Sequence, residues 1–338
     1  MKLSKRERVS TFADLSGLTT LLGLLPTRPV LLVLTYHRIG NSANCRYDSD
    51  VFSATSDELD EHVRFLKPRW HISTLEEVLE VVEGTRKLPR QTVLFTFDDG
   101  YLDSYSAAYP ILASHDVQGV FFLTTGHIGT QLIPWWDQIA YIIKSSKSIT
   151  FELRYPSTCR FDINKQGIDV VVRKVLQMYK SIANQDGALF LNSLEEACDT
   201  RRPNGAERCM LNWDEAAEML AGGMAIGSHT NSHRVLSKLS AEEQLGEMLN
   251  SKQLLEERLN TKVQSIAYPV GGRDAFTDIT RDAAEKAGYR LAFSYYGGVN
   301  LADSFHPYDM ARVAVYHVTT ARFKLQATLT AVTGRSLF

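Results

Sequence analysis

Short apolar runs recur along the chain, and each of them ends at polar or charged residues. The runs are rich in β-branched and aromatic residues and carry no charge, a pattern typical of strands that are buried on both faces. Segments with apolar residues at helical spacing separate the runs, and this alternation favours a parallel sheet with crossover helices. The runs that predict strands are 29–35, 92–97, 119–124, 224–228, 263–268, 291–294 and 313–316.

Local signals place the helices between these strands. Thr74 and Glu77 have the spacing of a capping box at the start of one helix, and Pro110 predicts a break inside another. Gly288 is a common type of residue at a helix C-terminus. About seven strands in this alternation fit a slightly small α/β barrel better than an open sheet. The predicted helices are 57–66, 75–82, 105–115, 213–221, 241–259 and 280–287.

One long segment, 135–211, interrupts the alternation. It is polar, it contains no run typical of a barrel strand, and its own pattern predicts helices and one exposed strand. We therefore expect an α+β insertion with a small core of its own. The chain then divides into an N-terminal helix at 1–28, a barrel formed by 29–134 and 212–338, and this insertion.

The first 25 residues combine basic and apolar character. Residues 1–8 are basic and residues 15–25 are mostly apolar, but Asp14 interrupts the pattern and the apolar run is too short to cross a bilayer. We expect residues 9–25 to form an amphipathic helix. This helix either caps the barrel, which is the simpler interpretation, or makes peripheral contact with a membrane surface.

Composition narrows the class of protein. The 338 residues are 44% hydrophobic and 10% aromatic, which is enough to fill the core of a globular enzyme. A net charge of −2 gives no indication of a nucleic acid partner. The four cysteines are widely spaced and include no C-x-x-C pair, which fits a reducing compartment. Because no clear export signal is present, we expect a cytoplasmic protein that acts at the inner membrane surface.

The most informative strand ends in two carboxylates. Residues 92–97 are followed directly by Asp98, Asp99 and Gly100. Burying an unpaired carboxylate inside a sheet is costly, so this pair must lie at the open end of the strand, where barrel enzymes place their active sites. Gly100 permits a tight turn, which lets both carboxylates face one cavity.

Two histidines follow another predicted strand. His229 and His233 come directly after 224–228, and one helical turn would place both imidazoles on the same side. Two imidazoles and a carboxylate suit a first-row divalent cation, with Asp99 as the third ligand and Asp98 left as a general base. Each motif alone has a common structural explanation, as packed histidines or as a turn. Together, each after a buried strand, they favour a metal site.

The sequences TFDDG at 96–100 and SHTNSH at 228–233 resemble the first two motifs of the NodB-type polysaccharide deacetylases, which are carbohydrate esterase family 4. The resemblance covers roughly 30–320, apart from the insertion. It implies a distorted (β/α)7 barrel that uses a divalent cation to remove N-acetyl groups from polymeric or lipid-linked sugars. Zinc is the expected ion, with cobalt, nickel and manganese as alternatives.

The same resemblance assigns roles to individual residues. By position, Asp98 resembles the catalytic base of the family, and Asp99, His229 and His233 resemble its metal ligands. An N-acetylated glycan is the implied partner. The chain looks closest to the branch associated with exopolysaccharides, which includes the poly-N-acetylglucosamine deacetylases.

The third family motif departs from its usual form. Where the family often has Arg-Pro-Pro-Tyr-Gly, this chain has Ala-Tyr-Pro-Val-Gly at 267–271, so Ala267 replaces the arginine that orients the base. Many members linked to exopolysaccharide synthesis share this form. Arg312 and Arg273 remain as alternative sources of the positive charge, and each also has the simpler interpretation of a surface residue. The backbone N–H of Val270 is a candidate donor to an oxyanion.

The general acid is also displaced. In many family members a histidine follows the last barrel strand, whereas here the best match is 31–37, near the start of the chain, which ends in His37. This order resembles the poly-N-acetylglucosamine deacetylases and implies a circularly permuted barrel. His317, after the last predicted strand, is the competing candidate. Tyr101 and Trp136 are candidates for substrate contact at the rim.

Two other functions stay open on the sequence alone. One is a carbohydrate-binding member of the same fold that has lost activity, and its only support is the missing arginine of the third motif. The other is a related amidohydrolase that acts on a small cyclic amide. The sequence does not indicate an oligomeric state.

Overall fold

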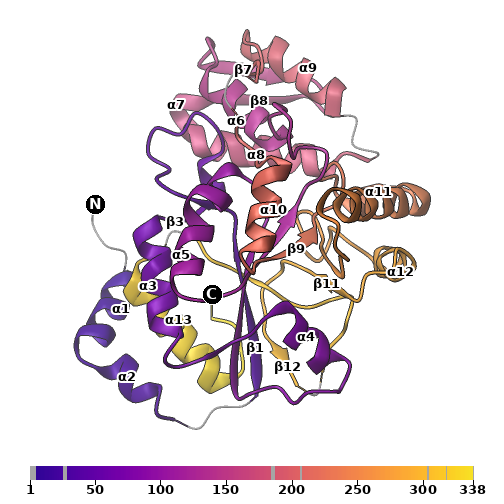
Figure 1. The fold of residues 1–338 in the computed structure, drawn as a ribbon. Helices are drawn as coiled ribbons and strands as arrows, with labels where there is room; N and C mark the ends of the chain where they lie inside the picture. The colour runs from indigo at the N-terminus through magenta and orange to yellow at the C-terminus, as the bar shows by residue number, and fades with distance from the viewer. Residues whose placement is uncertain are drawn as a thin grey trace.

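The computed structural model describes residues 5–25, 29–183, 187–205, 208–302, 304–316 and 318–337. A curled parallel sheet lies at its centre, with helices on the outside and the insertion over one end (Figure 1). From one edge to the other, the principal strands run in the order β11, β10, β9, β6, β5, β1. Their bounds are Leu291–Phe293 for β11, Ser265–Ala267 for β10, Ala225–Ser228 for β9, Gly119–Leu123 for β6, Gln91–Phe97 for β5 and Val30–Tyr36 for β1.

A short strand near the C-terminus joins the two edges of this sheet. β13 (Val313–Ala314) pairs in parallel with β1. Just before β13, Met310 forms a parallel bridge to Phe293 of β11. The segment 310–314 therefore closes a ring that has, in the described residues, six principal strands plus β13. This confirms the distorted α/β barrel predicted from the sequence.

Further short strands extend the sheet without changing the ring. β4 (His71–Ile72) runs parallel to the start of β5, and β12 (Asn300–Leu301) runs antiparallel to the start of β1. A separate pair, β2 (Arg38–Ile39) and β3 (Phe52–Ala54), continues the chain from β1.

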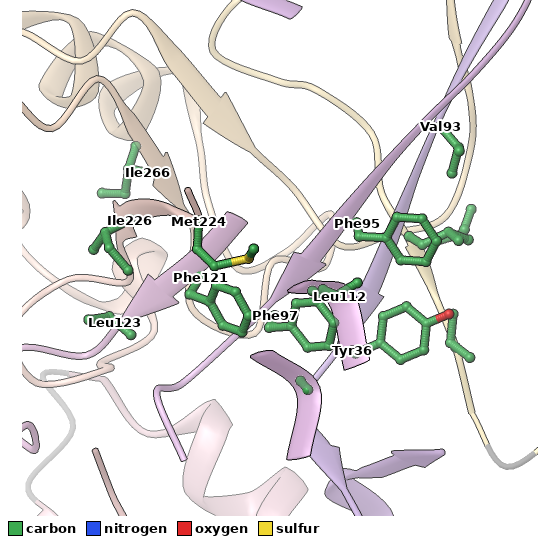
Figure 2. Packing of buried hydrophobic residues seen from close by; sticks show 14 of the residues in the cluster. Tyr36, Val93, Phe95, Phe97, Leu112, Phe121, Leu123, Met224, Ile226 and Ile266 are labelled. Atoms are coloured by element: carbon green, nitrogen blue, oxygen red, sulfur yellow. The ribbon is translucent and has the colours of Figure 1, made fainter. Parts of the chain in front are cut away.

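Alternate residues of the barrel strands face two different cores. Phe122 of β6 and Phe293 of β11 have ring centroids 5.4 Å apart although these strands are not neighbours, so their cluster fills the barrel interior. Phe97 and Phe121 point the other way, toward the helices, with ring centroids 4.7 Å apart (Figure 2). Because both faces are covered, the strands read as continuous apolar runs.

The outer helices begin where the sequence places their N-caps. Thr74 and Glu77 form the predicted capping box at the start of α4, and Asn212 and Ser240 begin α10 and α11 in the same way. Each box satisfies backbone N–H groups that the first helical turn leaves without partners. The bounds are α3 Ser56–Leu66, α4 Leu75–Val82, α10 Trp213–Ala221, α11 Ala241–Leu259 and α12 Asp278–Lys286.

One outer helix shows the break that Pro110 predicted, and another helix was not predicted. The helix expected at 105–115 is divided into a π-helical turn (Ser104–Ala108) and α5 (Tyr109–Ser114), and Pro110 lies in the first turn of α5, where no N–H is needed. The helix α13 (Thr320–Thr333) was not predicted, because its apolar residues show no clear spacing along one helical face. Burial of Phe323 in the outer core stabilises α13 instead.

The N-terminal segment forms two helices rather than one. Gly17 takes a left-handed φ of 75° between α1 (Lys5–Leu15) and α2 (Leu18–Leu22), so the single helix expected at 9–25 is wrong. Both helices contact α13, on the side of the barrel away from the insertion (Figure 1). No helix among the described residues has the length and apolar content needed to cross a bilayer.

The insertion has a hydrophobic cluster of its own. The buried residues of this cluster lie between Trp135 and Met210, within the insertion, apart from Tyr101, which comes from the barrel side. The division at 135 and 211 stays a prediction. The elements are α6 Trp135–Lys144, β7 Thr150–Leu153, β8 Cys159–Asp162, α7 Ile163–Gln166, α8 Ile168–Ser181 and α9 Gly187–Cys198.

Truncating an aromatic ring of the outer core should destabilise the barrel. Phe121 is fully buried and stacks on Phe97, so we expect Phe121→Ala to lower the free energy of unfolding by about 3–5 kcal/mol. Urea denaturation followed by circular dichroism measures this change. The exposed Leu249→Ala is the control, with an expected loss below about 0.5 kcal/mol, and equal losses for both variants would contradict the packing described here.

Candidate metal and catalytic site

Asp98 and Asp99 lie at the C-terminal end of β5, and both are only 2% exposed. The chain turns there, because Asp99 has φ 74° and Gly100 has φ 85°. A Cβ atom at position 100 would lie 2.7 Å from Ile128, so this turn requires glycine on both conformational and steric grounds. The turn lets two adjacent carboxylates face the same cavity, as predicted from the sequence.

The two histidines lie on an irregular loop after β9. The helical turn expected at 229–233 is wrong, because Thr230 and His233 both have positive φ angles, 64° and 56°. Glu247 of α11 holds the loop by accepting hydrogen bonds from two successive backbone N–H groups, those of Asn231 at 3.0 Å and Ser232 at 2.8 Å. The two imidazoles still converge, with ring centroids 4.7 Å apart.

Asp99 and the two histidines bring their ligand atoms together. Oδ1 of Asp99 lies 3.3 Å from Nε2 of His233 and 3.5 Å from Nε2 of His229. One ligand atom from each of the three residues lies within 4.8 Å of the other two. The Nδ1 atom of His229 is 2.8 Å from the carbonyl oxygen of Ala267, which fixes the tautomer and leaves Nε2 facing the cavity.

The protonation states of these residues also fit a cation. Burial lowers the pKa of His229 to about 4, so the imidazole is neutral near pH 7. Burial by itself raises the pKa of Asp99, but the adjacent His233 outweighs burial and holds the pKa well below its usual range. Oδ1 of Asp99 is buried without a hydrogen-bond partner among the described residues. A neutral imidazole and an ionised, unsatisfied carboxylate are donors of the kind that a first-row divalent cation requires.

Asp98 has a different environment, because it forms a buried ion pair with Arg312. Both terminal nitrogens of Arg312 donate to the two carboxylate oxygens at 2.7 Å, and Arg312 is fully buried. Nε of Arg312 donates to the carbonyl oxygen of Ser294 at 3.0 Å, which fixes the guanidinium inside the barrel. Burial raises the pKa of Asp98, but Arg312 outweighs burial, and the net pKa is lowered. Asp98 is thus ionised and rigidly oriented.

Arg312 therefore supplies the positive charge beside Asp98 that Ala267 of the third motif cannot supply. Of the two arginines considered from the sequence, Arg273 is exposed and lies over the ring of Tyr296 at 4.1 Å instead. Arg312 comes from the segment that closes the barrel, so its contact with Asp98 joins residues 214 positions apart.

Both aspartates and both histidines of the site line one cavity of about 740 Å³ at the end of the barrel. The insertion forms one wall through α8, and the loops after β1, β10 and β11 form the other. A second cavity, of about 1000 Å³, lies on the insertion and contains none of the predicted site residues. The lining of the first cavity includes His37, Asp98, Asp99, His229, His233, Trp136, Val270, Lys174, Lys180, Tyr295 and Tyr316.

His37 lines this cavity beside Asp98. β1 and β5 pair along their whole length, with Tyr36 opposite Phe97, and the N–H of Asp98 donates to the carbonyl oxygen of Tyr36 at 2.9 Å. β1 and β5 thus end at the same height in the sheet. His37 and Asp98, the residues that follow them, occupy equivalent positions at the C-terminal end of the barrel. The ring of Tyr295 packs edge-on against His37 at 5.5 Å. The competing His317 lies outside the described residues.

The remaining predicted residues divide into two groups. Val270 lines the cavity with a positive φ of 63°, and in the described part of the chain its N–H meets no acceptor. Trp136 also lines the cavity and packs on His233, with ring centroids 4.4 Å apart. Tyr101, in contrast, is fully buried and does not line the cavity.

Tyr101 instead connects the barrel to the insertion. Its hydroxyl donates to Asp137 at 2.8 Å and accepts from Nε1 of Trp136 at 2.6 Å. Burial raises the pKa of Asp137 to about 7, although its other oxygen accepts from the N–H of Asp48. This network fixes Trp136, which in turn packs on His233.

The α8 wall was not identified from the sequence. Lys174 and Lys180 line the cavity from α8, and Tyr295 faces them from the loop after β11. Helical periodicity marks the buried side of α8 but cannot indicate what its other side faces. The pattern therefore carried no signal for these residues.

Comparison with known proteins agrees with this geometry. The family model described as polysaccharide deacetylase matches residues 85–292. This chain belongs to the polysaccharide deacetylase family. A relative from Bacillus subtilis (strain 168), YxkH, provisionally named a polysaccharide deacetylase, is 23% identical over 286 residues, which are 84% of this chain and 71% of YxkH.

Solved deacetylase structures share the fold. The Streptococcus pyogenes deacetylase PplD, in complex with acetate, matches with a TM-score of 0.58 and 20% identity over 89% of this chain and 99% of PplD. IcaB from Ammonifex degensii matches with a TM-score of 0.57 and 19% identity over 89% of this chain and 98% of IcaB. These likenesses support the NodB-type barrel for this chain.

The three ligand residues should be needed for metal binding. After treatment with a chelator and reloading with zinc, we expect about one ion per wild-type chain and a loss of at least about tenfold in affinity for Asp99→Ala or His233→Ala. Inductively coupled plasma mass spectrometry measures the zinc content of the wild type and of each variant. His115→Ala is the control, because His115 pairs with Asp60 away from the cavity. Retention of zinc by Asp99→Ala would contradict this site.

The ion pair between Asp98 and Arg312 should contribute strongly to the free energy of unfolding. Arg312→Met leaves a buried carboxylate without its partner, so we expect a loss of about 3–5 kcal/mol in the free energy of unfolding at pH 7. Urea denaturation of the metal-free protein measures this loss in the free energy of unfolding. The double variant Asp98→Asn/Arg312→Met should regain at least about 1 kcal/mol, because the unpaired charge is gone.

Arg273→Met is the matched control for this prediction. Its side chain is exposed, so the expected loss is below about 1 kcal/mol. A small loss for Arg312→Met, or no recovery in the double variant, would show that the pair does not orient Asp98.

Proposed function

We propose that this chain is a metal-dependent hydrolase that removes N-acetyl groups from a polysaccharide or lipid-linked glycan. One observation supports this most strongly: an ionised Asp98, oriented by Arg312, shares a cavity with the three ligands of a divalent cation. A fixed base beside a cation site is what the hydrolysis of an amide by activated water requires. The expected ion is zinc, since two imidazoles and one carboxylate are a typical zinc set.

The proposed reaction uses three groups of this chain. When bound, the cation acts as a Lewis acid that polarises the acetyl carbonyl and lowers the pKa of water. Asp98 accepts a proton from the water whose oxygen attacks the carbonyl carbon. The N–H of Val270 donates to the oxygen that gains negative charge. His37 donates a proton to the sugar nitrogen as the carbon–nitrogen bond breaks, and acetate leaves.

The acid role of His37 rests on its position. It lies level with Asp98 at the ends of two paired strands and lines the same cavity, so one group can take a proton while the other gives one. The edge-on contact with Tyr295 restricts the imidazole ring. Trp136 is proposed as a sugar contact, because it is part of the lining and is held by Tyr101.

The Arg312 contact bears on whether the chain is active. The replacement of the motif-three arginine by Ala267 was the only support for a member that binds glycans without hydrolysing them. Because Arg312 reaches Asp98 from another element, the base has its positive partner. We therefore favour an active enzyme, and we propose the exopolysaccharide-associated branch on the Ala-Tyr-Pro-Val-Gly motif at 267–271.

Acetate release tests the proposal directly. We expect zinc-loaded wild-type protein to release acetate from N-acetylglucosamine oligomers or a related N-acetylated glycan, and a chelator to abolish release. Asp98→Asn should lower kcat by about 10²–10⁴-fold while zinc content is retained, because Asn cannot accept the proton. His37→Gln should lower kcat by about 10²-fold or more with little change in KM.

The controls separate catalysis from folding and from metal loss. His115→Ala alters a side chain that pairs with Asp60 away from the cavity, and we expect a change in kcat/KM below about fivefold. Wild-type acetate release by Asp98→Asn would overturn the mechanism. Zinc binding without release from any N-acetylated glycan would favour a binding protein, and hydrolysis of cyclic amides alone would favour the other amidohydrolase class.

A further inference from the structure

The N-terminal helices expose most of their large apolar side chains. Fourteen large hydrophobic residues of the described chain are exposed, and seven of them lie within the first 25 residues. The most exposed are Leu15 at 84%, Leu24 at 78% and Phe12 at 70%. Such a concentration on two short helices exceeds what scattered surface residues produce. We call this set the N-terminal apolar face: Val9, Phe12, Leu15, Leu18, Leu21, Leu24 and Leu25.

The helices are attached to the barrel by the opposite side. Ser10, Ala13 and Thr19 are the buried residues of α1 and α2, and both helices contact α13. Asp14 also forms an ion pair with Lys324 of α13 at 3.4 Å. Small and polar residues thus face the protein while large apolar residues face outward. This is the reverse of an ordinary surface helix, whose large apolar side chains point to the core.

Charge indicates what covers this face. The first turn of α1 contains Lys5, Arg6 and Arg8, which are all exposed, with only Glu7 of opposite sign. Cations at a helix N-terminus oppose the helix dipole, so they do not stabilise the helix. Basic residues next to exposed phenylalanine and leucine are typical of helices that lie in the interface of a membrane with anionic lipids. A second copy of this chain would bring the same cations to a symmetric contact.

We propose that α1 and α2 dock this protein on the surface of a membrane that contains anionic lipids. The N-terminal apolar face enters the boundary between headgroups and acyl chains, and Lys5, Arg6 and Arg8 lie at the anionic headgroups. The protein lies on the membrane and does not cross it, in agreement with the absence of a spanning helix in the described residues. The catalytic cavity is at the insertion end of the barrel, away from α1 and α2 (Figure 1), so docking leaves it open.

Vesicle binding by the full chain tests this proposal. We expect the wild type to float with vesicles of phosphatidylglycerol and phosphatidylcholine, and to bind phosphatidylcholine vesicles at least about tenfold more weakly. The variant Phe12→Ser/Leu15→Ser/Leu21→Ser/Leu24→Ser should lose binding by about tenfold or more, because it removes the apolar area that enters the bilayer. A matched control removes four exposed apolar residues elsewhere: Leu132→Ser/Ile149→Ser/Leu249→Ser/Ile279→Ser.

A charge variant keeps the test valid if the serine variant fails to fold. Lys5→Glu/Arg6→Glu leaves the apolar face intact, and we expect it to weaken binding to anionic vesicles by about tenfold, as added salt should for the wild type. Thermal melting checks the fold of each variant. Equal binding by wild type and serine variant would overturn the proposal. A wild type that binds no vesicle but forms a dimer, lost in the serine variant, would assign the face to a second copy instead.

Acetate release separates this proposal from the catalytic one. Because the apolar face is remote from the cavity, the serine variant should hydrolyse soluble N-acetylated oligomers at the wild-type rate. Loss of vesicle binding with unchanged hydrolysis supports docking by these helices. Vesicle binding by a chain that releases no acetate would leave docking intact and reject only the hydrolase.

Discussion

The buried ion pair between Asp98 and Arg312 is the interaction on which this structure depends most. Two charges inside a barrel are tolerated only when each satisfies the other, and here both hydrogen bonds are 2.7 Å long. Arg312 belongs to the segment that joins β11 to β1, and its Nε binds the carbonyl oxygen of Ser294. The same contact therefore orients the proposed base and ties the closing strand of the barrel to the central strand.

The pair also explains why two neighbouring aspartates have different chemistry. Arg312 donates to both oxygens of Asp98, so a fixed positive charge already lies beside that carboxylate. Asp99 turns away through its positive φ and keeps an oxygen without a hydrogen bond among the described residues, close to the imidazoles of His229 and His233. Backbone conformation and one arginine thus give the two neighbours of a single Asp-Asp sequence the different roles proposed for them, base and ligand.

The insertion adds a wall and a support to this site. Its α8 faces the barrel loops across the cavity, and its Trp136 packs on His233. Tyr101 supplies the link, since it belongs to the β5 turn but is buried in the core of the insertion. Barrel and insertion therefore both contribute to the contacts that hold His233 in place.

The sequence by itself determined the strands, most helices, and the identity of Asp98, Asp99, His229 and His233. These follow from local periodicity and from polar residues at strand ends, which depend only on neighbours in the chain. Tertiary structure decided the rest. It brought Arg312 rather than Arg273 to Asp98, buried Tyr101 in a core instead of leaving it at the rim, and formed α13 from a segment without a clear helical pattern. It also turned the large apolar side chains of α1 outward. Each of these outcomes depends on which distant segments meet, and no local pattern records that.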